Sequence, residues 1–327
     1  MATTRIMPLH IGKGRNVGTA VSDILEYVKD AEKTDQGRLV TCFQCNPEIA
    51  DAEFCFSKRR YQTSTGRKQE NDVIAYHVRQ SFKPGEITPE EAAIGGYVSE
   101  LIHDGDCVQF GLGGTPSAVA AALTDKHDLG IHTEMLGNAM INLIRSGAVT
   151  NRRKTLHPGK TVCAFFLGDE DAVDFLENTP DVMFRPAAYT NHPATIARNE
   201  NMVSVNTTLQ VDLLGQVSSE SIGSRQYSGT GGAMDFAYGA HNAPNGRSII
   251  AVNATAKGGS LSRISAALPV GSAVSIPRNI VDYVVTEFGI ARLRNCSVRQ
   301  RVENLIAVAH PDFRAELARE AQKLLLW

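Results

Sequence analysis

A glycine-rich stretch at residues 111–116, GLGGTP, constrains the fold of this chain more than any other feature. It follows a short apolar run, 107–110, that is typical of a buried strand, and it precedes SAVAAAL at 117–123, which is typical of a helix. A strand, a glycine turn and a helix in this order leave free backbone N–H groups at the helix start, where they can bind an anion. The same pattern also suits a tight turn that has no ligand.

One carboxylate, Glu134, follows this turn at the end of a second predicted strand, 129–133. A second glycine loop, GTGGAMDF at 229–236, again precedes a predicted helix. Two such loops and a carboxylate at a strand end are the parts of a site in which a nucleophilic carboxylate lies beside backbone donors. Taken alone, Glu134 is also consistent with a surface or helix-capping glutamate.

Three further side chains compete for roles in this site. Glu220, in SSESIGSR, is an alternative nucleophile because it precedes the second glycine loop in sequence. His132 is predicted to be a strand residue rather than a general base, because a carboxylate nucleophile needs no deprotonation at neutral pH. Asp235 is predicted to orient the second loop as a cap rather than to act in catalysis.

Predicted strands and helices alternate from about residue 93 to the end of the chain. After Glu134, strands are predicted at 161–167, 182–186, 202–210, 248–253, 273–276 and 283–286, and closing helices at 298–307 and 312–326. Such alternation predicts an α/β domain with a mostly parallel sheet.

Composition excludes several classes of protein. The chain has 327 residues, enough for two domains, with 43% hydrophobic and 21% charged residues. A net charge of -2 gives no overall attraction to nucleic acid or to a membrane surface. No segment approaches the roughly 20 apolar residues of a membrane span, and the first residues lack the apolar core of a signal peptide. We therefore expect a cytoplasmic protein that does not bind membranes.

The six cysteines are scattered and do not suggest a disulfide framework. Cys42 and Cys45 form a CxxC pair, but a zinc site needs a second pair of ligands, and Cys55 and His77 do not have suitable spacing. We expect reduced structural thiols and no bound metal, with a metal or redox role for the CxxC pair as the alternative.

Residues 1–92 are predicted to form a small α+β unit. Helices are expected at 20–29 and from Pro47 to 63, strands at 38–43 and 72–79, and Thr88 is expected to cap a further helix that starts with Pro89. The segments MATTRI, EYVKDAEKT, AEFCFSKRRYQTSTGRKQ and DVIAYHVRQSFKPGEITPEEA resemble the first part of a MobA-type plasmid mobilisation relaxase.

The relaxase resemblance implies a tyrosine nucleophile that nicks DNA beside a metal held by clustered histidines, and the matching position is Tyr27. No His-x-His motif occurs in this chain. Without the metal the largest electrostatic contribution to the reaction is missing, so Tyr27 is expected to be vestigial and DNA is not expected as a partner. Lys58, Arg59 and Arg60 are expected to form a solvated helix face, with weak DNA affinity as the alternative.

From about residue 93 onward a second resemblance covers the rest of the chain. The segments GLGGTPSAV, DLGIHTEM, GAVTNRRKTLHPGK, NENMVSVNTTLQVDLLGQVSSESIGSRQYSGTGGAMDF, TAKGGSLSRI, TEFGIARLR and AHPDFR resemble the acetyl-CoA hydrolase/transferase family. Within that family they are most similar to 4-hydroxybutyrate and butyrate:acetate CoA-transferases. The glutamate of the Thr-Glu-Met motif is the nucleophile of the family, and this position is Glu134 in the present chain.

The resemblance implies that CoA is a substrate, carried as a glutamyl-CoA thioester, and that the partners are an acyl-CoA and a short-chain carboxylate. Backbone N–H groups at 113–114 and 231–232 would bind the oxyanions of the reaction. The full set of residues expected to bind the oxyanion or CoA is Leu112, Gly113, Gly114, Thr115, Pro116, Leu209, Gly231, Gly232 and Lys257.

The two resemblances divide the chain into a relaxase-like fragment, 1–92, and a CoA-transferase-type domain, 93–327. Members of the transferase family have an additional N-terminal α/β domain, and the relaxase-like segment occupies its place here. Three functions follow as hypotheses: a CoA-transferase with impaired activity, an acyl-CoA hydrolase, and an inactive fusion that keeps a vestigial DNA-binding fragment. A homo-oligomer is left open.

Overall fold

The computed structural model describes residues 3–10, 17–28, 50–66, 73–81, 87–111 and 113–326. They divide into two compact units, Met1–Glu86 and Ile87–Trp327. The predicted boundary between residues 92 and 93 falls inside helix α3 (Pro89–Glu100). It stays a prediction of where the resemblance to one family ends and the resemblance to the other begins.

The first unit contains two strands and two helices. Strands β1 (Thr3–His10) and β2 (Val73–Ser81) pair antiparallel along their length. Helices α1 (Val17–Val28) and α2 (Ala50–Thr65) contact each other, and Ala20 and Val21 of α1 are buried. The predicted strand at 38–43 and the CxxC pair lie outside the described residues. The expected small α+β unit is confirmed.

A six-stranded sheet forms the centre of the second unit, in the order β19-β18-β14-β9-β3-β4. Its pairs are parallel except for β18 with β19, so the predicted mostly parallel sheet is confirmed. The strands are β3 (Cys107–Phe110), β4 (Gly130–Ile131), β9 (Met202–Thr207), β14 (Arg247–Ala251), β18 (Tyr283–Thr286) and β19 (Gly289–Arg292).

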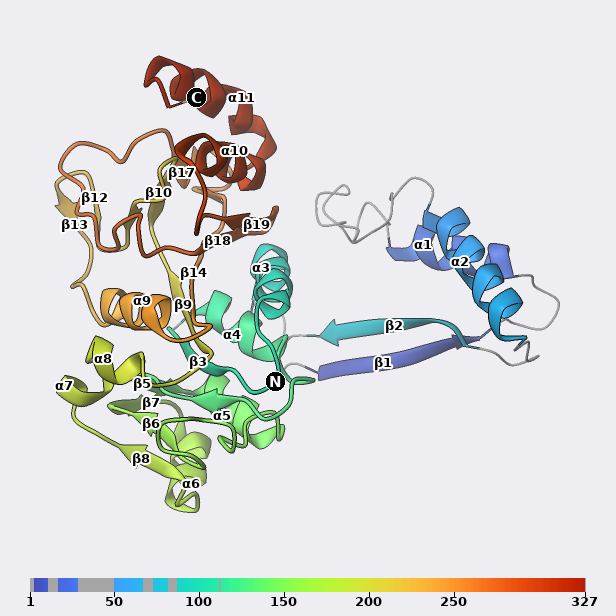
Figure 1. The fold of residues 1–327 in the computed structure, drawn as a ribbon, viewed down its shortest axis with the longest axis horizontal. Coiled ribbons are helices and arrows are strands. Elements are labelled where there is room, and N and C mark those ends of the chain that lie inside the picture. The colour runs from blue at the N-terminus through green and yellow to red at the C-terminus, as the bar shows by residue number, and fades with distance from the viewer. Residues whose placement is uncertain are drawn as a thin grey trace. The chain divides into compact units, whose positions relative to one another are not determined.

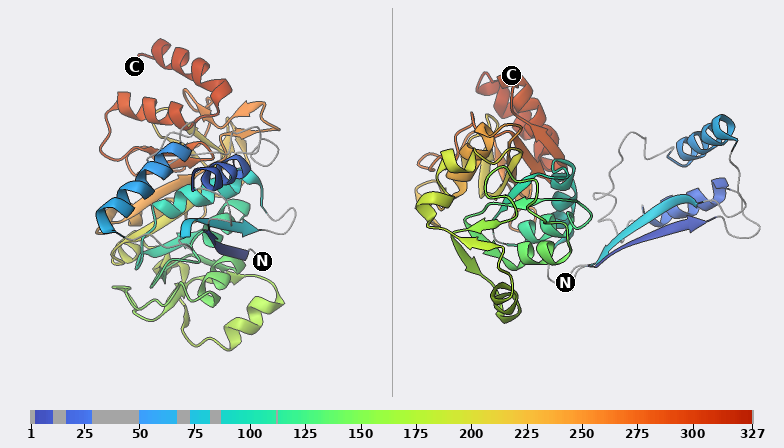
Figure 2. Two further views of the ribbon diagram at one scale, coloured as in Figure 1. Left: turned by 90° about the vertical axis from the view of Figure 1, so that its right-hand side faces the viewer. Right: turned by 60° about the horizontal axis from the view of Figure 1, so that its bottom comes forward.

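Helices pack on both faces of this sheet (Figures 1 and 2). On one face, α3, α4 (Gly114–Ala121) and α5 (Asn138–Arg145) enclose a core with alternate residues of the strands, such as Val203 and Val205 of β9. On the other face lie α9 (Ala233–Asn242), α10 (Val298–Val308) and α11 (Pro311–Lys323). Helix α9 crosses β9 and β14, so that its first turn lies near the carboxyl ends of the strands.

Local sequence explains the start and the packing of α3. Thr88 caps the helix as predicted: its hydroxyl accepts from the N–H of Glu91, and the Glu91 carboxylate accepts from the N–H of Thr88. Gly95 lets α3 approach α4, because a Cβ there would lie 2.7 Å from the carbonyl carbon of Ala118.

Short elements complete the unit around this sheet. Helices α6 (Glu170–Glu177), α7 (Ala187–Thr190) and α8 (Pro193–Ile196) follow one another along the chain. The two-stranded pairs are β5 (Met135–Gly137) with β7 (Phe165–Leu167), β6 (Thr161–Cys163) with β8 (Val182–Phe184), β12 (Ser221–Ile222) with β13 (Arg225–Gln226), and β15 (Thr255–Ala256) with β16 (Leu261–Ser262). Strands β11 (Val217–Ser218), β10 (Gln210–Asp212) and β17 (Ile264–Ser265) form a three-stranded sheet.

Two predicted strands need correction. The strand expected at 161–167 is interrupted at Ala164, because the carbonyl of Glu134 accepts from the N–H groups of both Ala164 and Phe165 and so offsets the ladder. The segment 273–276 is not a strand: it forms only an isolated bridge between Ile276 and Val217, while Val274 is exposed. A short apolar run between a glycine and a proline was therefore not sufficient to form a strand.

Candidate functional site

Glu134 lies at the carboxyl edge of the parallel sheet, between β4 and β5. The predicted strand does not end at Glu134, because β5 begins at the next residue. The backbone carbonyl of Glu134 accepts two hydrogen bonds, from the N–H groups of Ala164 and Phe165, which fix its position. The side chain is half-buried, and its Oε2 accepts a hydrogen bond of 3.2 Å from the N–H of Gly232. The second glycine loop, 98 residues further along the chain, thus supplies the contact.

Gly232 is the N-cap residue of α9, and no side chain caps this helix. No capping side chain therefore competes for the first N–H groups of α9, and the helix dipole stabilises a negative charge there by about 0.3–1 kcal/mol. A carboxylate or an oxyanion at this position is stabilised both by these N–H groups and by the helix dipole.

An amide side chain, Asn191, meets the same point. A Cβ on Gly232 would lie 2.6 Å from Glu134 Oε2 and 2.7 Å from Asn191 Nδ2, so both atoms lie against the glycine. The Oδ1 of Asn191 accepts from the hydroxyl of Thr190 at 3.0 Å, which turns the amide nitrogen toward Gly232. Asn191 was not among the predicted site residues, because it lies between two predicted elements and no local pattern marks it.

His132 links the segment that carries Glu134 to the segment that carries Asn191. It is fully buried, and burial lowers the pKa of its imidazole to about 4, so the ring is neutral at pH 7. Its Nε2 donates to the carbonyl of Thr190 at 2.9 Å. The strand end that carries Glu134 is thereby joined to the residue that precedes Asn191.

Asp235, in the first turn of α9, is an acid close enough to Glu134 for the two charges to interact. Burial raises the pKa of Asp235, and the Glu134 carboxylate raises it further, whereas His192 acts in the opposite direction. Asp235 makes no N-terminal capping bond in α9, so the expectation of a capping role is wrong.

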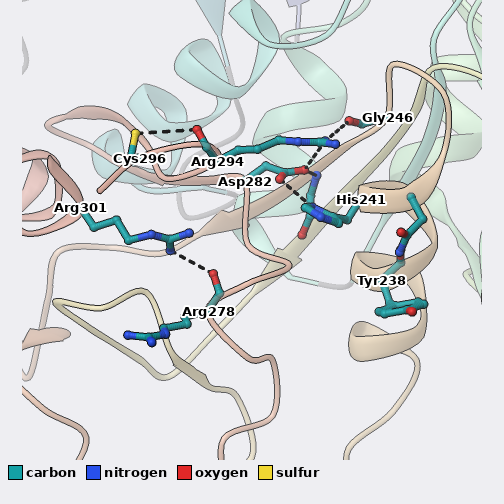
Figure 3. Close-up of polar contacts among 10 residues, drawn as sticks. Tyr238, His241, Gly246, Arg278, Asp282, Arg294, Cys296 and Arg301 are labelled. Carbon is teal, nitrogen blue, oxygen red and sulfur yellow. Dashed lines mark hydrogen bonds and ion pairs between the residues drawn. The ribbon is translucent and has the colours of Figure 1, made fainter. Parts of the chain in front are cut away.

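The far end of α9 is fixed by a buried carboxylate. Asp282 is fully buried; its Oδ1 lies 2.8 Å from His241 Nδ1 in the last turn of α9, and its Oδ2 accepts from the N–H of Ser248 on β14. Arg294 bridges Asp282 and the carbonyl of Gly246 (Figure 3). These bonds hold α9 on the sheet and so fix the position of its first turn beside Glu134.

The first glycine loop lies on the other side of the strand ends. Gly113 has a φ of 116°, which favours glycine, and Thr115 and Pro116 are buried in the first turn of α4. The carboxylate of Glu91 lies against Gly114, where a Cβ would meet it. Gly111, Gly113 and Pro116 line a cavity of about 130 Å³ together with Met135, the residue after Glu134. Leu112 lies outside the described residues.

Comparison with known proteins identifies this architecture. Residues 168–321 match the family model for the acetyl-CoA hydrolase/transferase C-terminal domain. Over these residues the chain matches the C-terminal domain of the acetyl-CoA hydrolase/transferase family. A second match covers residues 27–97, with the MobA/VirD2-like relaxase nuclease domain. Both predicted resemblances are therefore confirmed.

Relatives of the hydrolase/transferase domain extend the match upstream. The chain is 52% identical over 238 residues to succinyl-CoA:cyclohexane-1-carboxylate CoA transferase of Geobacter metallireducens, covering 73% of this chain and 54% of the relative. It is 45% identical to 4-hydroxybutyrate coenzyme A transferase of Clostridium kluyveri, covering 77% of this chain and 58% of the relative. The chain thus spans just over half the length of these curated relatives.

Solved structures agree. RipA from Yersinia pestis is 44% identical with a TM-score of 0.69, covering 73% of this chain and 54% of that chain. A 4-hydroxybutyrate CoA-transferase from Porphyromonas gingivalis is 42% identical with a TM-score of 0.65, covering 73% of this chain and 56% of that chain. The fold of the hydrolase/transferase domain is thereby established.

The other predicted site residues of this domain lie on turns. Leu209 is half-buried and donates its N–H to the carbonyl of Ser218. Gly231 is exposed with a φ of 54°, and Lys257 is exposed with a φ of 53° in the turn between β15 and β16. The alternative nucleophile Glu220 is buried, and its Oε2 has no hydrogen-bond partner. Their roles in binding CoA stay predictions.

A further carboxylate, Glu287, was missed by sequence reasoning. It lies at the end of β18, where Oε2 accepts from the N–H of Ala254 at 2.8 Å, and burial raises its pKa. The rule that ligands bind at the carboxyl ends of parallel strands would have selected it, had the strand order been known.

Two further expectations concern metals and the relaxase-like fragment. Tyr27 lies in α1. On α2, Arg59 and Arg60 are exposed as expected, whereas Lys58 is half-buried, so the expected solvated face is confirmed for two of its three residues. Within the described ranges, no three His, Cys, Asp or Glu side chains are arranged to hold a metal ion. Among those same residues, no helix combines the length and apolar character that crossing a bilayer requires.

Proposed function

We propose that this chain is an acyl-CoA:carboxylate CoA-transferase that moves CoA between an acyl-CoA and a short-chain acid of the acetate, butyrate or 4-hydroxybutyrate type. The observation that carries the proposal is the position of Glu134: its carboxylate accepts from the N–H of Gly232, the N-cap of α9, and the Asn191 amide nitrogen lies beside the same glycine. A carboxylate nucleophile that already binds a backbone N–H and has an amide side chain close by is suited to acyl transfer through an enzyme-bound thioester.

The reaction balances with Glu134 alone as the covalent group. Its carboxylate attacks the thioester carbonyl of acyl-CoA, and collapse of the tetrahedral oxyanion breaks the C–S bond, which leaves a mixed anhydride and CoA thiolate. The thiolate then attacks the Glu134 carbonyl, expels the first carboxylate and forms the glutamyl-CoA thioester. An incoming carboxylate reverses these steps and leaves as the new acyl-CoA.

Different donors serve the different oxyanions in this proposal. The N–H of Gly232, which already binds the Glu134 carboxylate, and the amide of Asn191, which lies beside the same glycine, stabilise the charge that develops on the Glu134 carbonyl oxygen. In this proposal CoA is bound by the first glycine loop, Gly113 to Pro116, and by the exposed Lys257. A cytoplasmic location suits this activity and the four free cysteines of the described residues, Cys55, Cys107, Cys163 and Cys296.

Mass spectrometry of the intact chain tests the proposal. After incubation with butyryl-CoA, the peptide containing Glu134 should carry CoA less one water, borohydride should reduce this thioester, and acetate should remove the label. Glu134→Gln is the control and should stay unlabelled. An unlabelled wild-type chain would reject the proposal and favour the inactive fusion. Loss of the label in buffer without any acid would instead indicate the hydrolase, the activity named in more distant relatives at 29% and 27% identity.

A further inference from the structure

A second cavity, of about 490 Å³, lies at the amino ends of strands β6 and β8. Its walls come from the end of α5, the loop that follows α5, and the first residues of both strands. His132 and Val162 form a parallel bridge, so Ile131 and the cavity residue Thr161 lie level with each other. Glu134 lies three residues beyond that level, about 10 Å further along the strand direction. The cavity is therefore separate from the site around Glu134.

The lining of this cavity combines an apolar wall with one unpaired cation. Its apolar side chains are Ile144, Val149, Pro158 and Val182. The charged side chains of the described lining are Arg152, Lys160 and Asp181. Lys160 Nζ lies 2.7 Å from Asp181 Oδ1, so these two charges neutralise each other. Arg152 is exposed and forms no ion pair with a described residue, which leaves the lining with a net positive charge.

The uncharged hydroxyl groups of the wall already have partners. The hydroxyl of Thr150 donates to Asp128 Oδ1 at 2.8 Å, and the hydroxyl of Thr179 donates to the carbonyl of Phe175 at 2.7 Å. The guanidinium of Arg152 is therefore the group that remains for a polar ligand atom. A guanidinium binds a carboxylate through two parallel hydrogen bonds, and the apolar wall suits a hydrocarbon chain attached to that carboxylate.

The wall of the cavity also holds the strand that leads to Glu134. Asn151, a lining residue, accepts through Oδ1 from the N–H of Ile131 at 2.9 Å. Lys154 is buried, and its Nζ donates to the carbonyls of Ile131 and Lys160 at 2.7 and 2.6 Å. Both backbone polar groups of Ile131 are thus bound by the loop that forms the cavity wall.

We infer that this cavity is a second ligand site, which takes a monocarboxylate with an apolar chain and whose occupation is sensed at Ile131. An apolar cavity of about 150 Å³ holds one benzene molecule, so the larger volume here has room for a chain of about six to ten carbons. The carboxylate pairs with Arg152, and the chain lies against the apolar wall. The inference goes beyond the proposed function, because neither binding nor its measurement needs chemistry at Glu134.

Isoleucine methyl NMR tests the site with octanoate as the probe. The signal of Ile144, which lines the cavity, should shift until it saturates, and the signal of Ile131 should shift with the same midpoint. Ile250 and Ile306, which do not line the cavity, should stay in place. Octanamide has the same chain without the charge and should cause no shift. An unmoved Ile144 signal in octanoate would overturn the site, and a shift at Ile144 without one at Ile131 would overturn the link to β4.

Three variants test where the acid binds. Arg152→Gln should raise the Kd of octanoate about tenfold or more, as expected for losing a hydrogen bond between charged groups. Arg319→Gln, at an exposed position of α11, is the matched control and should bind as wild type does. Equal affinity in Arg152→Gln would overturn the inference. Glu134→Gln should also keep the wild-type Kd; a tenfold change in that variant would place octanoate at Glu134 and overturn the separate site.

Discussion

Adding one methyl group at Gly232 should disable the site without unfolding the protein. Gly232 has a φ of -86°, which alanine adopts freely, so Gly232→Ala introduces no backbone strain and keeps the N–H donor. The new Cβ would lie 2.6 Å from Glu134 Oε2 and 2.7 Å from Asn191 Nδ2. One or both side chains must then move by several tenths of an ångström to reach ordinary contact distance.

The expected loss is that of a misplaced nucleophile or of one oxyanion donor. Each effect is worth about 100-fold or more, and loss of one donor typically costs about 2.7–4 kcal/mol. We therefore expect formation of the glutamyl-CoA thioester to slow by about 100- to 1,000-fold. Because alanine is a poorer N-cap than glycine, the free energy of unfolding should fall by only about 1 kcal/mol or less.

The assay is the rate of CoA labelling at Glu134 by quenched-flow mass spectrometry, with thermal unfolding measured on the same samples. Gly229→Ala is the matched control: it lies in the same loop, and nothing lies within 4 Å of its new Cβ. It should label at the wild-type rate. Wild-type labelling in a folded Gly232→Ala variant would refute the role given to the contact between Glu134, Gly232 and Asn191.

Three further predictions follow from the same structure. The pKa of His132 is about 4 in the folded chain, against an ordinary value of 6.5. Protons therefore bind preferentially to the unfolded chain, and the free energy of unfolding should fall by about 3 kcal/mol as the pH drops from 6.5 to 4. Urea titrations of His132→Gln should not show this loss. Asn191→Ala should lower kcat about 100-fold with little change in KM, and equal kinetics would exclude it as a donor. Gly95→Ala should lower the melting temperature because its Cβ would meet the backbone of Ala118, whereas Gly96→Ala, with open space around its Cβ, should not; equal melting temperatures would contradict this packing.

Much of the site could be predicted from local sequence. Glycines that precede helices mark turns in any tertiary context, and a carboxylate at a strand end is visible from the hydrophobic pattern around Glu134. The cap at Thr88 follows from residues three positions apart, which a helix always brings together. Asn191 and Glu287 could not be found in this way, because neither belongs to a pattern with a period.

The sequence by itself determined the alternation of strands and helices, the two glycine loops and the candidate carboxylates, because each depends on neighbours within a few residues. It did not determine which loop meets Glu134. The nearer loop, at 111–116, lies across the strand ends, and the hydrogen bond comes from Gly232, 98 residues away. Only the strand order β4-β3-β9-β14 and the helix α9 that crosses two of these strands decide that contact, because spatial neighbours in a parallel sheet are set by crossover connections rather than by distance along the chain.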